Sequence, residues 1–192
     1  MDWNNLAEDN RPLAGLLATP LGQGPWPGVI VIHDLFGISR DLRKQAEWLA
    51  SEGFLTLAPE LFGEGLRAAC LYRVFGDLRR RTGSTFDRIE AAPSALATQP
   101  DCTGAIGILG FCIGGDFALL LAGSRVYRVA SVNYGSVPTD VEALLGSSCP
   151  IVGSFGGRDP RLRGAADKLE QALTANRIEN DVQEYPRQDM PS

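Results

Sequence analysis

The chain has 192 residues, of which 44% are hydrophobic and 21% charged, a composition typical of a folded globular protein and not of a disordered one. Eighteen Lys and Arg against 23 Asp and Glu give a net charge of −5. This balance leaves no basic stripe that could neutralise a run of phosphates, so we expect no nucleic-acid partner. The length predicts a single domain over residues 1–192.

The N-terminus and the apolar stretches show no targeting or membrane signal. Residues 1–5 are acidic and polar, without the positively charged and apolar segments of a leader. Gly or Arg interrupts the longest apolar stretches well before they could cross a bilayer. We therefore expect a cytoplasmic protein without a membrane partner. It is also expected to be a monomer.

The counts of histidine and cysteine limit the chemistry. His33 is the only histidine, which excludes a histidine-rich metal site. The cysteines lack the C-x-x-C spacing of zinc sites, and without an export signal they are expected to be free thiols. They are Cys70, Cys102, Cys112 and Cys149. We expect neither a metal nor an organic cofactor.

Apolar runs alternate with helical patterns in the first third of the chain. A strand is predicted over 13–18, and the β-branched run over 28–33 is typical of a strand buried on both faces. A helix is predicted next, with Ser39 as its N-cap and Gly53 as its stop. Residues 54–58 form the following strand, which Pro59 closes.

The same alternation continues to the end of the chain. Helical patterns cover 66–80, 86–96 and 117–122, and a further helix runs between Leu162 and Leu173. Strands are predicted over 105–109, 129–132, 150–155 and 181–185. Strands that alternate with helices predict an α/β fold with a mostly parallel sheet and helices on both faces.

The segment GFCIGG at 110–115 lies between a predicted strand and a predicted helix. A nucleophile elbow needs small residues two positions before and after the nucleophile, because the tight turn leaves no room for Cβ atoms. Gly110 and Gly114 meet this need around Cys112. The helix N-terminus favours a thiolate there, although Asp116 in the same turn opposes it. The alternative is a glycine-rich turn with Cys112 as a small apolar filler; a dinucleotide-binding fingerprint fits less well.

Four segments together resemble the dienelactone hydrolase family of α/β-hydrolases. They are PWPGVIVIHDLFG at 25–37, APELFG at 58–63, GFCIGG at 110–115 and GGRD at 156–159. The resemblance extends from about Pro12 to Tyr185 and implies a three-layer α/β-hydrolase fold. It further implies an enzyme that hydrolyses lactones or carboxylic esters without a cofactor.

The resemblance also implies roles for individual residues. In a Cys–His–Asp triad, Cys112 is the nucleophile and Asp159 the acid that orients the imidazole. The alternative for Asp159 is a turn residue that caps the next helix. The backbone N–H groups of Leu35 and Ile113 correspond to the oxyanion hole. Asp34 corresponds to an acidic residue that holds the resting thiol, where the best-known members carry the longer glutamate.

Two other features of the sequence are not assigned to catalysis. His33 matches a position that varies between family members, and we interpret it as a wall residue bonded to backbone. Arg73 and the arginines at 79–81 could meet a substrate carboxylate, as family arginines do, or form a solvated helix face. None of them is singled out.

The family's triad histidine follows the last strand in a pattern close to Tyr-Pro-x-Ala-Gly-His-x-Phe. This chain reads YPRQDMPS at 185–192, with Met190 in the histidine position and no closing helix. The codons AGG CAG GAC ATG CCT TCC, read one nucleotide earlier after a CCG codon, encode Glu-Ala-Gly-His-Ala-Phe. We therefore expect a frameshift that truncates the domain at its C-terminus; the alternative is a naturally divergent tail.

The sequence thus predicts a hydrolase that cleaves a small lactone or carboxylic ester through Cys112, with the triad histidine missing. One alternative is a catalytically inactive member of the fold that binds a small molecule or a partner. Another is a redox-responsive thiol protein that uses the elbow cysteine without a triad.

Overall fold

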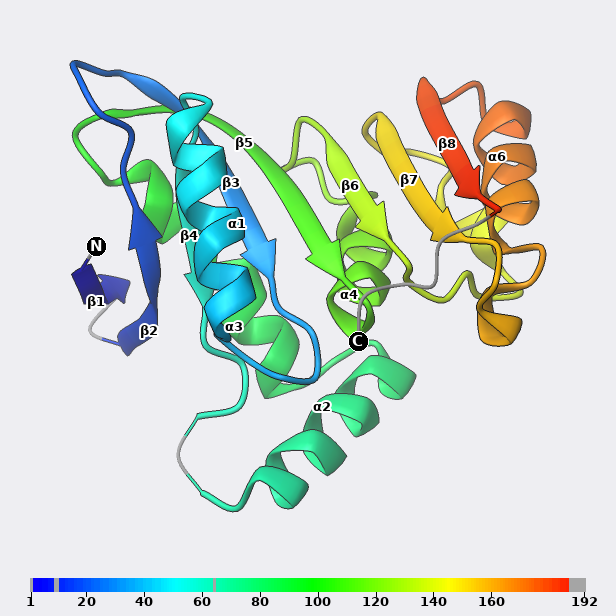
Figure 1. The fold of residues 1–192 in the computed structure, drawn as a ribbon, viewed down its shortest axis with the longest axis horizontal. Helices are drawn as coiled ribbons and strands as arrows, with labels where there is room; N and C mark the ends of the chain where they lie inside the picture. Colours follow the sequence, from blue (N-terminus) through cyan, green and yellow to red (C-terminus); the bar gives the residue numbers. More distant parts are fainter. Residues whose placement is uncertain (1, 9–10, 64, 187–192) are drawn as a thin grey trace. The chain divides into compact units, whose positions relative to one another are not determined.

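A computed structural model describes residues 2–8, 11–63 and 65–186. The chain forms two compact units, Met1–Ile106 and Gly107–Ser192, and each is described by itself (Figure 1). The expectation of a single domain stays a prediction. Residues 187–192, with Met190 in the histidine position and the predicted truncation, lie outside the described residues.

The first unit contains a mixed sheet in the order β1-β2-β4-β3. Its strands are β1 (Asp2–Glu8), β2 (Arg11–Ala18), β3 (Trp26–Ile32) and β4 (Leu55–Pro59). β2 pairs antiparallel with both β1 and β4, whereas β3 and β4 are parallel. β2, β3 and β4 agree with strands predicted from the sequence, whereas β1 was not predicted.

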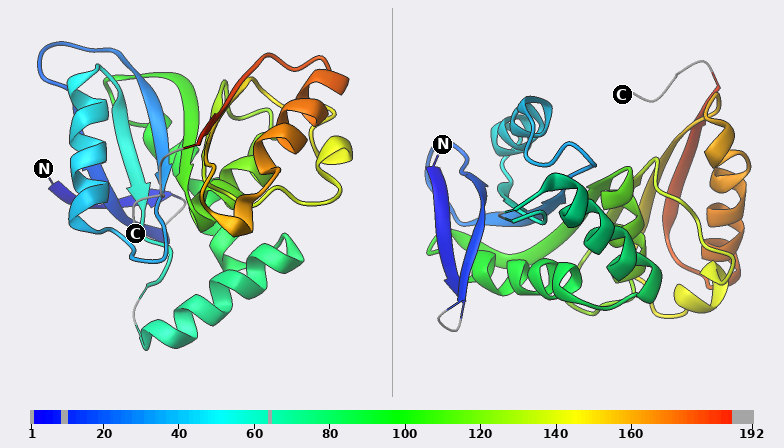
Figure 2. Two further views of the ribbon diagram at one scale, coloured as in Figure 1. Left: turned by 45° about the vertical axis from the view of Figure 1, so that its right-hand side comes forward. Right: turned by 90° about the horizontal axis from the view of Figure 1, so that it is seen from below.

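Helices cover both faces of this sheet. α1 (Arg40–Ser51) and α3 (Ser84–Ala97) pack against opposite faces, and α2 (Arg67–Arg80) packs against α3 (Figure 2). The predicted start of α1 is confirmed, because the Ser39 side chain accepts a hydrogen bond from Leu42 N–H. The predicted stop is confirmed as well, since Gly53 has φ 90° two residues after the last helical residue.

The second unit is a parallel α/β arrangement. β5 (Cys102–Phe111) runs from the first unit into the second, and β6 (Ala130–Asn133), β7 (Ile151–Gly156) and β8 (Asn180–Tyr185) follow it in parallel register. α4 (Ile113–Leu121) packs on β6, and α6 (Ala165–Ala175) packs on β7 and β8. The short helix α5 (Val141–Leu144) was not predicted. Leu162 lies in a 3₁₀ turn, Pro160–Leu162, and not in the helix that follows.

Each unit has its own apolar core. In the first unit Ile30, Val31 and Ile32 of β3 are fully buried, as predicted for a strand covered on both faces. In the second unit Phe117 and Phe155 are fully buried, together with leucines of α4 and α6. The predicted α/β fold class is confirmed. None of the helices in the described ranges combines the length and the apolar character that a membrane span requires.

Candidate active site

Cys112 occupies the turn between β5 and α4. It is the N-cap residue of α4, with φ 54° and ψ −120°. A positive φ is unfavourable for a residue that carries a Cβ, and it persists only where the surrounding structure enforces it. The backbone at Cys112 therefore has the strained turn that the elbow interpretation requires.

The glycines around Cys112 are required by close backbone contacts. A Cβ on Gly110 would collide with the carbonyl group of Gly114, which explains why position 110 is glycine. A Cβ on Gly115 would lie 2.9 Å from the carbonyl oxygen of Asn133, which itself accepts the Cys112 N–H at 3.0 Å. The predicted need for a small residue is confirmed at 110 and stays a prediction at 114, and a side chain at 115 would collide with backbone as well.

The first turn of α4 combines amide donors with a half-buried acid, Asp116. Ile113 is the first helical residue, and the N–H groups of a first turn have no partner within their own helix. Asp116 accepts a hydrogen bond from Ser136 N–H. Burial nevertheless raises the pKa of Asp116 to about 6, because it outweighs this hydrogen bond. Asp116 is therefore predominantly charged above that pH.

Asp159 follows β7 and caps the short turn Pro160–Leu162. Its Oδ1 accepts the backbone N–H of Arg161 at 2.9 Å, so the capping geometry considered as the alternative is present. The Arg161 guanidinium also binds the carboxylate, and this hydrogen bonding lowers the pKa of Asp159. A carboxylate has about four acceptor positions, so these bonds do not exhaust its capacity.

The interaction of Arg161 with Asp159 was not predicted from the sequence. Its hydrogen bonds and charge attraction to Asp159 raise the pKa of its guanidinium, and the charge of Cys112 contributes to the same effect. Arg161 therefore links the predicted acid to the predicted nucleophile electrostatically. The only signal in the sequence was an arginine two residues after Asp159.

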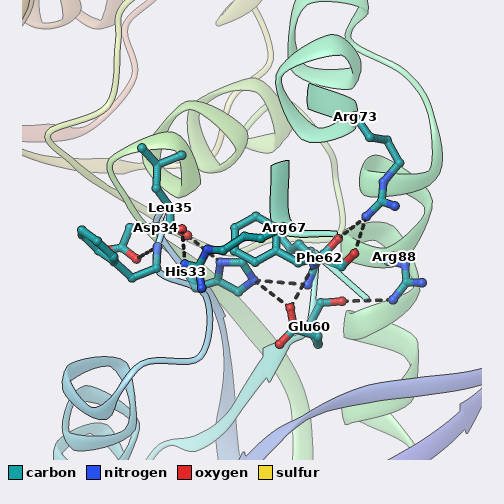
Figure 3. Close-up of polar contacts among 10 residues, drawn as sticks. His33, Asp34, Leu35, Glu60, Phe62, Arg67, Arg73 and Arg88 are labelled. Carbon is teal, nitrogen blue, oxygen red and sulfur yellow. Dashed lines mark hydrogen bonds and ion pairs between the residues drawn. The ribbon is translucent and has the colours of Figure 1, made fainter. Parts of the chain in front are cut away.

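In the first unit, the segment after β3 carries the other predicted site residues (Figure 3). The His33 side chain is buried, and its Nδ1 lies 2.8 Å from the Asp34 carbonyl oxygen. Its Nε2 accepts the backbone N–H of Leu61 at 3.2 Å. Both ring nitrogens are therefore engaged with backbone, and the interpretation of His33 as a backbone-bonded residue is confirmed.

The two residues after His33 are also held by hydrogen bonds. Oδ1 of Asp34 accepts the backbone N–H of Phe36 at 2.8 Å. The Leu35 carbonyl accepts a hydrogen bond of 2.7 Å from Arg67, whose guanidinium lies 5.5 Å from the centre of the Phe62 ring. This segment borders an open cavity of about 670 Å³, lined by Phe36, Phe62 and Arg67 among others. The volume suits a small organic molecule.

Glu60 lies at the same cavity. Burial of its carboxyl opposes ionisation, but the Phe62 N–H and the charge of Arg88 favour it, and the pKa of Glu60 is lowered. Its Oε1 accepts the Phe62 N–H at 2.9 Å. The cavity is therefore lined by an ionised acid, Glu60, and by the Arg67 guanidinium.

The helix arginines bind protein groups. Nη2 of Arg73 donates to the carbonyls of Leu61 and Phe62, at 2.8 Å each. Arg80 pairs with Asp77 at 2.6 Å. These contacts assign both arginines a structural role. Across the described residues, no group of three or more His, Cys, Asp or Glu side chains could hold a metal ion.

Comparison with known proteins decides the family. The model of the dienelactone hydrolase family matches residues 13–189. This chain belongs to the dienelactone hydrolase family. By family it is therefore a hydrolase of lactones or carboxylic esters.

Individual proteins agree with this family assignment. A Synechocystis protein named as a carboxymethylenebutenolidase candidate is 27% identical over 209 residues, which cover 96% of this chain and 82% of the relative. The carboxymethylenebutenolidase of Pseudomonas putida is 25% identical over 167 residues, covering 79% of this chain and 68% of the relative. A solved Klebsiella pneumoniae structure, named as a dienelactone hydrolase candidate, has a TM-score of 0.80 at 23% identity and covers 95% of this chain and 83% of that one. The last match shows the α/β-hydrolase fold.

For this dienelactone hydrolase family member, the described structure holds the predicted residues in two groups. Cys112, Ile113 and Asp159 belong to the second unit, where the elbow and the capped turn position them. Asp34 and Leu35 belong to the first unit, in the segment after β3. Their catalytic roles stay predictions.

Proposed function

We propose that this chain cleaves a small lactone or carboxylic ester through a covalent thioester on Cys112. The observation that supports this most strongly is the Cys112 backbone, held at φ 54° and ψ −120° between β5 and α4. Such a turn presents a nucleophile at the end of a strand and beside the N-terminus of a helix. The amides of that helix favour negative charge on the sulfur and on a neighbouring oxygen.

The proposed reaction has two stages. The Cys112 thiolate attacks the acyl carbon, a C–S bond forms, and the carbonyl π electrons move to oxygen. The N–H groups of Leu35 and Ile113 stabilise this oxyanion. Its collapse breaks the ester C–O bond, and the released alkoxide takes up a proton. Water then attacks the thioester, which releases the acid and restores the thiol.

Two carboxylates have supporting roles in this proposal. Asp159 orients a triad histidine, expected in the position that Met190 now occupies. Asp34 holds the thiol in the resting enzyme. Without an imidazole, proton transfer to the leaving group and deacylation are expected to be very slow, since loss of a triad member lowers kcat by about 10⁶-fold in other enzymes.

The alternative is an inactive family member that binds a small molecule or a partner. One observation favours it: the only imidazole in the 192 residues is that of His33, and both of its nitrogens are engaged with backbone groups. Such a ring has no nitrogen left to accept a proton from Cys112. The two functions differ in whether Cys112 is needed.

A test uses a chromogenic ester, p-nitrophenyl acetate, on the unmodified chain. We expect release of about one p-nitrophenolate per chain and acetylation of Cys112 by mass spectrometry, followed by slow deacylation. Cys112→Ala abolishes the release, whereas the matched variant Cys102→Ala, which removes another half-buried cysteine, leaves it unchanged. Oxidation or alkylation of Cys112 without acetylation supports the redox alternative.

A second variant tests the histidine. Replacing residues 187–192 with Glu-Ala-Gly-His-Ala-Phe is expected to convert the single acylation into multiple turnovers. Absence of turnover in this variant, together with ligand binding that persists in Cys112→Ala, supports the binding protein and contradicts the hydrolase mechanism.

A further inference from the structure

The Leu35 N–H belongs to the peptide that joins Asp34 to Leu35. The carbonyl of that peptide accepts a hydrogen bond from His33 Nδ1 at 2.8 Å (Figure 3). It accepts a second one from Gly37 N–H at 3.2 Å. Because a trans peptide is planar, the direction of its C=O determines the direction of its N–H, which points the opposite way. A bond that fixes the Asp34 carbonyl thus aims the Leu35 N–H.

The same hydrogen bonds strengthen the Leu35 N–H as a donor. Donors on a carbonyl oxygen draw electron density toward it and polarise the N–H of the same peptide. The hydrogen bond from His33 contributes more to this polarisation than the one from Gly37, because it is the shorter of the two. It costs no reorganisation when a negative charge forms nearby, because the dipole is already oriented.

The contacts of His33 fix the orientation of its ring and, for a neutral ring, its tautomer. Its side chain is 1% exposed, and its ring centre lies 4.8 Å from that of Phe62. Nε2 accepts the Leu61 N–H, so a neutral ring must carry its proton on Nδ1, which then donates to the Asp34 carbonyl. Glu60 Oε1 is 3.7 Å from Nε2, too far for a hydrogen bond.

The segment that holds His33 is anchored by two arginines (Figure 3). Arg73 of α2 binds the carbonyls of Leu61 and Phe62, and Arg88 of α3 binds the Glu60 carbonyl at 3.1 Å. The support therefore runs from α2 and α3, through residues 60–62, to the His33 ring and the Asp34 carbonyl.

We propose that His33 is a positioning residue that aims and polarises the Leu35 N–H for the oxyanion of the reaction. The proposal rests on the proposed function, in which that N–H stabilises the oxyanion. It gives the chain's only histidine a part in the reaction without making it the base. Arg67 and Asp34 complete the arrangement by holding the C=O and the N–H of the next peptide.

Two substitutions separate the two nitrogens of the ring. His33→Asn places an amide N–H where Nδ1 lies and keeps the donor to Asp34, while it loses the acceptor for Leu61. His33→Gln places an amide oxygen where Nε2 lies and keeps that acceptor, while it loses the donor. The pair is matched because each variant removes one hydrogen bond of the same buried ring.

The readout compares two reactions of Cys112. Acylation by p-nitrophenyl acetate passes through an oxyanion, whereas alkylation by iodoacetamide does not. We expect His33→Gln to slow acylation about 10-fold or more while alkylation changes less than 2-fold, since loss of one oxyanion donor costs about 10²–10³ in rate. His33→Asn is expected to retain acylation within about 3-fold of the unmodified chain, a rescue by the retained donor.

Equal slowing of both reactions, or an unchanged ratio in His33→Gln, overturns the positioning role. Absence of Cys112 acylation in the unmodified chain instead overturns the proposed function, and the oxyanion role with it. The tautomer is measured independently by ¹⁵N NMR of the imidazole in the unmodified chain, where one histidine gives one spin system. A proton on Nδ1 is expected; a proton on Nε2 excludes the bond to Asp34 and overturns the proposal even if the variants fail to fold.

Discussion

The carboxylate of Asp159 and the guanidinium of Arg161 form a two-point ion pair, with Nε to Oδ1 at 3.0 Å and Nη2 to Oδ2 at 2.7 Å. The Arg161 side chain is 79% exposed, whereas that of Asp159 is 10% exposed. Because the charge of Cys112 also raises the pKa of Arg161, the guanidinium interacts with both predicted catalytic groups. An arginine here thus adds positive charge at the turn that follows β7.

Arg161→Gln is expected to slow alkylation of Cys112 by iodoacetamide at neutral pH, because the guanidinium charge favours the thiolate. The effect of one exposed charge is small because solvent screens it, so we expect a rate lower by about 2-fold. The pH profile of alkylation should move to higher pH. Arg163→Gln, an exposed arginine two residues away, serves as control; equal profiles for both variants would contradict the prediction.

Gly110→Ala is expected to destabilise the second unit strongly. The new Cβ would overlap the Gly114 carbonyl, and neither backbone segment can move without disrupting the elbow. We expect a loss of about 3–5 kcal/mol in the free energy of unfolding. Gly146→Ala is the matched control, because its Cβ would lie 3.8 Å from the nearest atom, an ordinary contact. Similar urea unfolding midpoints for the two variants would show that the elbow is less tightly packed than described.

Asp77→Ala is expected to lower the free energy of unfolding by about 2–4 kcal/mol at pH 7. The buried carboxylate accepts the N–H and hydroxyl of Thr85 at 3.0 and 2.7 Å, and so caps α3, whose N-cap residue Gly83 has no side chain to do so. Urea titration measures the loss. Glu90→Ala, an exposed acid on α3, is expected to change stability by less than about 0.5 kcal/mol.

The pH dependence of the Asp77 effect has a definite sign. Burial opposes ionisation of Asp77, but its bonds to Thr85 and Arg80 outweigh this and lower its pKa. A lowered folded pKa gives stability that is fully present above the unfolded value of 3.8 and lost as the pH falls through the folded pKa. The gap between the unmodified chain and Asp77→Ala should therefore shrink below about pH 4. A gap that widens there would refute this assignment.

Local sequence patterns predicted most of the helices and strands. The elements that were not predicted depend on contacts with distant parts of the chain. The β-branched run of β3 and the Ser39 cap carry their own signal, since burial on two faces and capping each need particular residue types. β1 was missed because Asp2–Glu8 contains no apolar run, and its pairing with β2 supplies the strand. Short elements such as α5 depend on tertiary packing more than on periodicity.

The candidate site also has features that the local sequence predicts and features that only the fold determines. The glycine at 110 was predictable because a tight turn excludes a Cβ atom there whatever the rest of the chain does. The role of Arg161 depends on a turn geometry that sequence spacing does not specify. The bonds of His33 to backbone were inferred, but the partner at Leu61 is 28 residues away and only the fold determines it.

Asp116→Asn is expected to stabilise the protein above pH 7 and to have little effect near pH 4. The folded pKa of about 6 exceeds the unfolded 3.8, so between these values the folded chain holds a proton that the unfolded chain has released, and stability falls as the pH rises. The full difference is on the order of 2–3 kcal/mol. Asparagine keeps an oxygen acceptor for the Ser136 N–H and removes only the charge.

The Asp116 prediction is checked by urea unfolding of the unmodified chain and Asp116→Asn from pH 4 to 8. Asp167→Asn, which changes an exposed acid of α6, serves as control. Carboxyls with lowered pKa values, such as Asp77 and Asp159, act equally in both proteins and cancel in the comparison. A difference that stays constant over this pH range would mean that Asp116 titrates in the folded chain as it does in the unfolded one.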